Sequence, residues 1–113
     1  MKHEMKLKEI YFNKIKSGDK IYEIRLNDEK RKLIKEGDII IFKKEPDLID
    51  YVEVEVEQLL RFSSFAEMLN SLSLKNIGFE GATKEDVEKI YHSFYSVETE
   101  KQFGVLAINV KTI

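Results

Sequence analysis

Three ionisable side chains lie close together in the segment from Gly18 to Arg25. Lys20, Glu23 and Arg25 fall within six positions of the sequence. Glu23 and Arg25 are two positions apart, so in a strand they point to the same face. If that face is inward, both charges need a partner or a ligand, because an unpaired buried charge is costly. A lysine and an arginine held beside one carboxylate could bind a phosphate or the polar edge of a base.

The same segment has a plainer interpretation. In a regular strand Lys20 would point away from Glu23, so it joins the other two only if the chain turns or bulges at Gly18-Asp19. Otherwise the charges form an outward ladder on an edge strand, and the ladder is the more frequent outcome for such a pattern. Glu23 and Arg25 would then be a structural ion pair, which contributes at most about 1 kcal/mol when exposed.

The periodicity of apolar residues predicts the elements that must position this segment. The pattern contains four or five strands and three helices without regular alternation of strand and helix, which is typical of an α+β fold with a small, mostly antiparallel sheet or barrel. The last strand is apolar on both faces, so we expect it to be central. The predicted elements are a helix near 7–17, strands at 20–26, 38–42, 51–57 and 103–110, a helical turn at 28–34, and helices that begin after Ser64 and Thr83.

Length and composition limit the kind of protein. The chain has 113 residues with one proline and five glycines, which predicts a single compact domain over residues 1–113. It contains no cysteine, so disulfides, zinc-thiolate sites and cysteine nucleophiles are excluded. No apolar run approaches the roughly 20 residues that span a bilayer. We therefore expect a soluble, cytoplasmic protein that does not bind membranes.

The charge is unevenly distributed along the chain. Residues 1–44 carry 13 Lys/Arg and 8 Asp/Glu, whereas residues 45–113 carry 6 and 13, and the net charge is −2. The basic part can attract a polyanion locally. The sequence pI of about 5.8 is nevertheless far below that of non-specific nucleic-acid coat proteins.

Standard cofactor and metal motifs are absent. The sequence has no phosphate-binding glycine loop, dinucleotide fingerprint, metal-ligand cluster or nucleophile elbow, so no cofactor and no metal are predicted. Its two histidines are far apart in the sequence. We expect His3 to be a solvated terminal residue and His92 to be a histidine at the surface or at the rim of a helix.

Gly18, Lys20, Glu23 and Arg25 match the glycine-x-lysine-x-x-glutamate-x-arginine signature of the ASCH domain family. The chain resembles the small stand-alone prokaryotic members of this family over nearly its whole length. The resemblance implies a PUA-like fold, a strongly curved and mostly antiparallel β-barrel flanked by about three helices. In that fold the signature lines a cleft beside the barrel.

The resemblance also implies a ligand, because the family is inferred to bind RNA or nucleotides. We therefore expect RNA, a nucleoside or a nucleotide as partner, while the oligomeric state stays open. Aromatic side chains near the signature would supply a stacking surface, and Phe79 is a further aromatic residue expected to cover the cleft. The expected ligand-binding residues are Gly18, Lys20, Tyr22, Glu23, Arg25, Tyr91 and Tyr95.

One branch of the family suggests an enzymatic alternative. A small bacterial member resembling this chain is a metal-independent amidohydrolase that removes the acetyl group from N-acetylated cytidine, with a lysine, a threonine and a glutamate as catalytic set. The matching catalytic candidates are Lys20, Glu23 and Glu80. The threonine of that set is Glu23 in this chain, and a glutamate cannot form the same ester intermediate, although it could act as a general base on water. A ribonuclease is a further enzymatic possibility.

Overall fold

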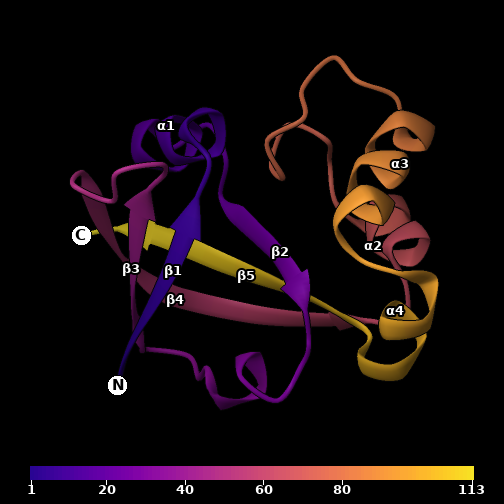
Figure 1. Cartoon of the computed structure of the whole chain (residues 1–113), viewed down its shortest axis with the longest axis horizontal. Coiled ribbons are helices and arrows are strands. Elements are labelled where there is room, and N and C mark those ends of the chain that lie inside the picture. Colours follow the sequence, from indigo (N-terminus) through magenta and orange to yellow (C-terminus); the bar gives the residue numbers. More distant parts are fainter.

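The computed structural model describes residues 1–113, which form five strands, four α-helices and one 3-10 turn (Figure 1). The strands are β1 (Lys2–Leu7), β2 (Tyr22–Leu26), β3 (Ile39–Lys44), β4 (Tyr51–Phe62) and β5 (Val105–Thr112). The helices are α1 (Glu9–Ser17), α2 (Phe65–Ser71), α3 (Lys84–Phe94) and α4 (Val97–Phe103), and the 3-10 turn η1 spans Arg31–Leu33.

All five strands belong to one curled sheet with the order β1-β3-β4-β5-β2. β1 pairs with β3 in parallel, and every other neighbouring pair is antiparallel. The sheet therefore forms a half-barrel in which β1 and β2 are the two edge strands. The predicted α+β class with a curved, mostly antiparallel sheet is confirmed.

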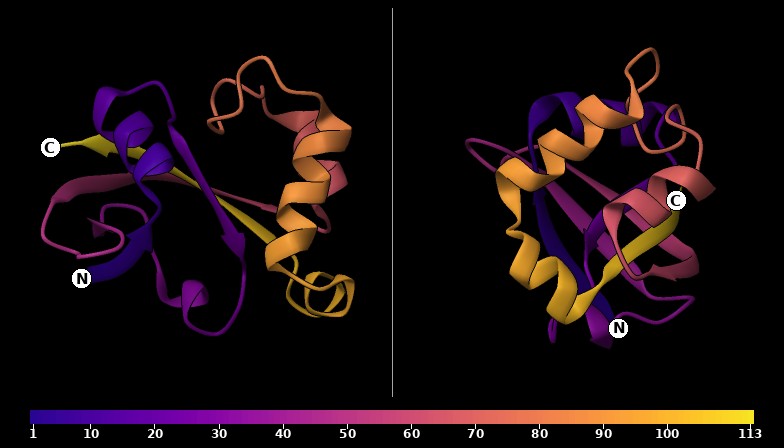
Figure 2. Two further views of the ribbon diagram at one scale, coloured as in Figure 1. Left: turned by 45° about the horizontal axis from the view of Figure 1, so that its top comes forward. Right: turned by 90° about the vertical axis from the view of Figure 1, so that its right-hand side faces the viewer.

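β4 and β5 connect the half-barrel to the remaining helices. The register of the β4–β5 pair shifts between Val56 and Gln58, which marks a bulge, and bulges bend a strand and increase its twist. Beyond this point β4 leaves β3 and continues beside β5 toward α2. Figure 2 shows from two other sides that α2, α3 and α4 gather at this end of the molecule.

The buried side chains form two clusters. β5 contributes to both, because successive strand residues point to opposite faces: Leu106 and Ile108 enter the first cluster, and Val105 and Ala107 the second. The prediction of a central last strand is therefore confirmed. The first cluster fills the half-barrel and includes Met5, Phe12, Ile40, Phe42, Val54 and Val56; the second lies under α2 and α3 and includes Ile24, Phe65, Met68, Ile77, Val87 and Tyr91.

Local signals define the helix boundaries. The hydroxyls of Ser64 and Thr83 accept hydrogen bonds from backbone N–H groups three residues later, at 3.1 and 3.2 Å. These bonds satisfy amides that a helix start would otherwise leave unpaired. Gly18 ends α1 with φ = 87°, a left-handed conformation that suits glycine. The predicted start of α2 and α3 and the end of α1 are thus confirmed.

Two elements were not predicted. Residues 2–7 form the edge strand β1, so Leu7 belongs to this strand and not to the helix that follows it. Residues 97–103 form α4, so Phe103 ends a helix and the last strand begins at Val105. Ser96 starts α4 by accepting a hydrogen bond from the Thr99 N–H at 3.1 Å.

The expectation for His3 is wrong. Because β1 pairs with β3, the His3 side chain is only 12% exposed, and its Nε2 lies 2.8 Å from Asp38 Oδ2. That hydrogen bond, together with one from the Lys35 N–H, lowers the pKa of Asp38 to about 2. His92 is partly buried on α3 and its Nε2 lies 2.7 Å from Glu100 Oε1. None of the helices is both long enough and apolar enough to cross a bilayer.

Candidate functional site

Lys20 lies in the turn between α1 and β2, before the strand begins. Its backbone N–H donates to the Lys14 carbonyl at 3.0 Å, which closes the turn after Gly18. The side chain is 3% exposed, and its Nζ donates to the Ile77 carbonyl at 2.9 Å and lies 3.2 Å from Glu23 Oε1. The turn therefore directs Lys20 to the same side as Glu23, which a regular strand would not do.

The loop before α3 is fixed against Lys20. The N–H groups of Ile21 and Tyr22 both donate to the Asn76 carbonyl, at 2.9 and 3.0 Å. Gly78 has φ = 94°, and a Cβ added there would lie 2.9 Å from Cδ of Lys20. A glycine is thus required where the loop crosses the lysine side chain.

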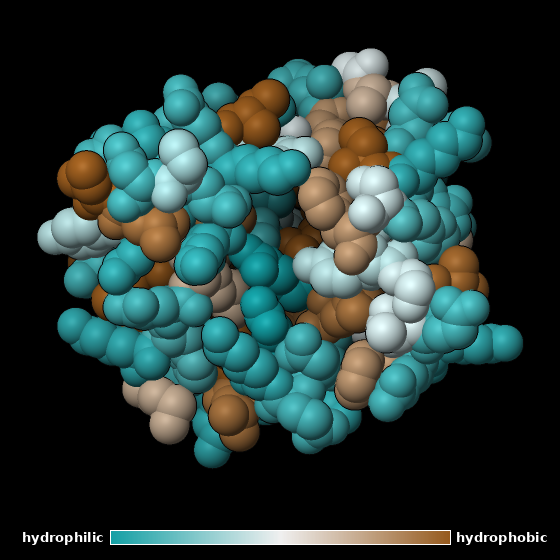
Figure 3. All heavy atoms as spheres, viewed as in Figure 1, coloured by the Kyte–Doolittle hydropathy of each residue, from teal (hydrophilic) through white to brown (hydrophobic).

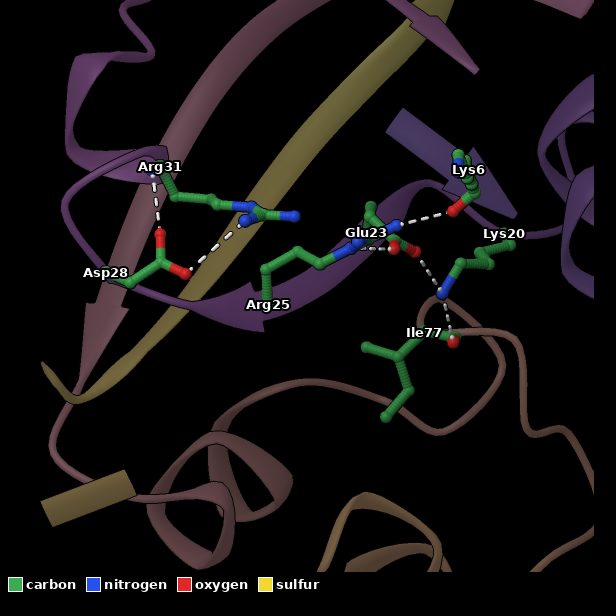
Figure 4. A network of polar contacts seen from close by, with 7 residues as sticks. All are labelled: Lys6, Lys20, Glu23, Arg25, Asp28, Arg31 and Ile77. Carbon is green, nitrogen blue, oxygen red and sulfur yellow. Dashed lines mark hydrogen bonds and ion pairs between the residues drawn. The ribbon is translucent and has the colours of Figure 1, made fainter. Parts of the chain in front are cut away.

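Glu23 and Arg25 continue the network from Lys20 toward β1 (Figure 4). Arg25 Nε donates to Glu23 Oε2 at 2.6 Å, so the two oxygens of this carboxylate have one cation each. Arg25 Nη2 donates to the Lys6 carbonyl at 2.9 Å. Arg25 therefore connects β2 to β1, the two edge strands of the half-barrel.

Burial and neighbouring charges shift the pKa values of Lys20 and Glu23 in opposite directions. Burial alone would raise the pKa of Glu23, but Lys20 and Arg25 together hold it below its usual value, so Glu23 is an anion at neutral pH. Burial lowers the pKa of Lys20, and the attraction of Glu23 offsets part of this shift. The network is thus a desolvated carboxylate between two cations.

A cavity of about 190 Å³ opens beside the network. In Figure 3 the face of the molecule is hollowed near its centre, between the strands and the helices. We call this hollow the signature pocket. Its lining residues are Lys6, Leu7, Lys8, Tyr11, Lys20, Glu23, Ile24, Arg25, Glu45, Phe79, Ile90, Tyr91, Phe94 and Tyr95.

Aromatic rings form much of the wall opposite the charged network. The Tyr91 ring stacks on Phe65, with centroids 4.8 Å apart, and meets Phe79 edge-on at 5.9 Å. Tyr91 is 7% exposed, and its buried hydroxyl has no hydrogen-bond partner. Burial, and secondarily the charge of Glu23, raises the pKa of this hydroxyl. An unpaired buried O–H is costly, and here it belongs to the wall of a pocket.

The structure brings together five of the expected catalytic and ligand-binding residues, with Phe79 as the expected cover, and leaves three apart. Lys20, Glu23, Arg25, Tyr91 and Tyr95 all line the signature pocket. The other three residues, Gly18, Tyr22 and Glu80, are absent from its lining: Gly18 is the exposed cap of α1, Tyr22 packs against the second core cluster, and Glu80 is exposed in the loop before α3.

Some lining residues were missed by the sequence analysis. Tyr11 falls in the helix expected near 7–17 and was not a site candidate, yet its ring centroid lies 5.6 Å from Lys20 Nζ. Lys6 at the end of β1 and Lys8 just after it line the pocket because the curled sheet brings its two edge strands, β1 and β2, within hydrogen-bond reach of each other at Arg25 and Lys6. Recognising the alternation of His3, Met5 and Leu7 as a strand pattern would have placed them there. No group of three His, Asp or Glu side chains lies close enough together to hold a metal ion.

A half-barrel with a charged network between its edge strand and a helical cover places the chain among PUA-like folds. The model of the ASCH domain family matches residues 5–113. The chain therefore belongs to the ASCH domain family, as its signature indicated.

Several solved structures resemble the chain, among them the following three. The crystal structure of hypothetical protein PH0355 shares 43% identity over 100% of both chains, with a TM-score of 0.89. The solution structure of protein PF0455 from Pyrococcus furiosus shares 35% identity over 100% of this chain and 98% of that one, with a TM-score of 0.79. The ASCH domain of Lactobacillus crispatus JV V101 shares the fold at 12% identity, covering 98% of this chain and 79% of that chain, with a TM-score of 0.63. No curated protein matches the chain.

Proposed function

We propose that this ASCH domain binds single-stranded RNA or a nucleotide and takes one base into the signature pocket. The observation that carries the proposal is the meeting of Lys20, Glu23 and Arg25 with the unpaired Tyr91 hydroxyl in one aromatic pocket. Membership of the ASCH family supports the same ligand class.

The polar groups of the pocket suit the edge of a base. The Tyr91 hydroxyl is a donor without a partner, and Arg25 Nη1 makes no hydrogen bond within the protein. The Glu23 oxygens keep free lone pairs after accepting one bond each, so they can accept from an amino or imino group. Donors and an acceptor beside aromatic rings are what recognition of an unstacked base requires.

The size of the pocket favours one base over a folded duplex. Its volume of about 190 Å³ is below the roughly 300–1,000 Å³ of typical small-molecule sites. A base would enter while its sugar and phosphate stay outside. Proteins that read RNA sequence mostly bind unpaired bases in this way.

The proposal is tested by titrating the protein with short single-stranded RNAs of each base and with the free nucleosides. Arg25→Ala and Tyr91→Phe should weaken binding, by roughly tenfold for each lost hydrogen bond to a charged or buried group. Arg61→Ala and Tyr51→Phe are matched controls, because both residues are exposed on β4 and do not line the pocket. If Arg25→Ala and Tyr91→Phe bind every RNA and nucleoside like the parent, the site is wrong.

A second candidate function is hydrolysis of N-acetylated cytidine, and one observation favours it. Lys20 is a buried amine with a lowered pKa beside a carboxylate, which is the environment of many catalytic lysines. In this scheme Lys20 would stabilise charge or transfer a proton, with Glu23 as its partner, whereas the third candidate, Glu80, could take part only if the loop before α3 moved it into the pocket. Release of acetate from acetylated cytidine at neutral pH, lost in Lys20→Met, would support it. No turnover at high enzyme concentration would exclude it, and Glu23→Thr tests whether the departure from the hydrolase set matters.

A further inference from the structure

A second hollow lies on the other side of Arg25. Its volume is about 360 Å³, and it shares Lys6 and Arg25 with the signature pocket. The hydrogen bond from Arg25 to the Lys6 carbonyl therefore runs where the two hollows meet. We call the second hollow the basic pocket. Its lining residues are Glu4, Met5, Lys6, Arg25, Lys30, Arg31, Lys43 and Leu48.

The basic pocket has more positive charge than its surroundings neutralise. Five of its lining residues are cations and one is a carboxylate. Lys6 and Lys30 take part in no ion pair, whereas Lys43 lies 3.4 Å from Glu4, whose side chain is 64% exposed. Arg25 is paired with the signature carboxylate. The uncompensated charge is thus carried mainly by two lysines at the rim.

Arg31 adds a donor that the protein leaves unused. Asp28 Oδ2 lies 3.3 Å from Arg31 Nη1, and Asp28 Oδ1 accepts from the Arg31 backbone N–H at 3.0 Å. These bonds hold the side chain in place, and Figure 4 shows its guanidinium extending toward Arg25. The Nε of Arg31 is buried without a partner. A guanidinium with an unused N–H, next to free lysines, is a typical environment for a phosphate.

We propose that the basic pocket is a phosphate subsite that holds the phosphate of the nucleotide whose base occupies the signature pocket. The link to a base rests on the proposed function, whereas the phosphate site is inferred from the cations that line the basic pocket. Because the two pockets meet at Arg25, a base and its adjoining phosphate can occupy both at once. The ligand is then a nucleotide or an RNA strand, and a free nucleoside fills only half of the site.

The test compares ligands that differ only in phosphate. The four nucleosides, their 5′- and 3′-monophosphates and sodium pyrophosphate are each titrated by calorimetry at low and at moderate salt. A monophosphate should bind about tenfold more tightly than its nucleoside, since a charged hydrogen bond is worth at least one such factor. This advantage should fall with salt, as phosphate contacts do.

Variants locate the effect. Lys30→Gln/Lys43→Gln should remove most of the advantage of a monophosphate over its nucleoside, although Lys6, Arg25 and Arg31 remain, and should leave nucleoside binding unchanged. Lys89→Gln/Lys101→Gln is the matched control, because it removes the same charge from exposed helix positions outside both pockets. Thermal unfolding of both variants checks that they are folded.

The outcomes separate the two proposals. If each monophosphate binds no more tightly than its nucleoside, or if the control variant loses as much affinity as Lys30→Gln/Lys43→Gln, the phosphate subsite is wrong and the base pocket can still be right. If pyrophosphate binds and loses affinity in Lys30→Gln/Lys43→Gln while no nucleoside binds, the phosphate subsite stands and the base pocket is wrong. Failure of every phosphate-bearing probe to bind overturns the phosphate subsite.

Discussion

Replacing Glu23 by glutamine is the most direct test of the buried network. Glu23→Gln keeps the shape of the side chain and removes its charge. The change leaves Lys20, which is 3% exposed, with only the Ile77 carbonyl and a neutral amide as partners. Arg25 loses the anion that its Nε contacts at 2.6 Å. We expect a large loss in the free energy of unfolding.

The magnitude follows from the geometry. At the 3.2 Å separation of Lys20 Nζ and Glu23 Oε1, unit charges attract by about 5 kcal/mol at an effective dielectric constant of 20. Removing one partner of a buried pair typically costs about 3–5 kcal/mol, because the other charge stays buried and uncompensated. Lys20→Met should cost less than Glu23→Gln, since Glu23 would still be paired with Arg25.

A double-mutant cycle measures the coupling. Urea unfolding followed by circular dichroism gives the free energy of unfolding of the parent, Glu23→Gln, Lys20→Met and the double variant. The double variant should be more stable than the sum of the single losses predicts, by about 2–3 kcal/mol. If the two losses add to within about 0.5 kcal/mol, Lys20 and Glu23 are not coupled and the description of the network is refuted.

Three further changes test other parts of the structure. Gly78→Ala should lower the free energy of unfolding in urea by about 2–3 kcal/mol, because the new Cβ would lie 2.9 Å from Lys20 Cδ in a left-handed backbone. Gly37→Ala is the control, since Gly37 has the same backbone conformation and open space around it. A smaller loss of stability in Gly78→Ala than in Gly37→Ala would contradict the close approach. The lowered pKa of Asp38, about 2 against 3.8 for the free side chain, means that its stabilisation is complete above about pH 4 and disappears as the pH falls through about 2. The difference in free energy of unfolding between the parent and Asp38→Asn should therefore decrease as the pH falls from about 4 to about 2. A difference that stays constant with pH would contradict the lowered pKa of Asp38. Glu100→Gln should cost about 1–3 kcal/mol by weakening two 2.7 Å contacts of a buried carboxylate that joins α2, α3 and α4, and an unchanged unfolding midpoint would disprove that role.

The parts of the fold that depend on local sequence could be predicted. Ser64 and Thr83 define helix starts because their hydroxyls bond to amides three residues away, and Gly18 ends a helix through its own backbone freedom. The pairing of Glu23 with Arg25 also follows from a spacing of two in a strand. These features need no knowledge of distant residues.

The missed parts depend on pairings between distant segments. β1 is a strand because it pairs with β3, more than thirty residues away in the sequence. Only His3, Met5 and Leu7 point inward, and the charged residues between them make this short alternation hard to recognise in the sequence. The acceptor for Arg25 Nη2 is the backbone carbonyl of Lys6. Every residue has such a carbonyl, so the residue type at position 6 could not indicate this contact. Glu80 was a candidate only through the resemblance to the amidohydrolase branch, and the structure shows it exposed in the loop before α3, whose Ile77 carbonyl accepts from Lys20 instead.

The edge strands β1 and β2 are joined by one hydrogen bond, from Arg25 to the Lys6 carbonyl. The guanidinium that makes this bond belongs to a residue that also lines both pockets. A ligand that competes for this guanidinium would release one edge of the barrel wall from the other without breaking any strand pairing. A ligand bound at Arg25 would therefore contact the same side chain that links the two free edges of the half-barrel.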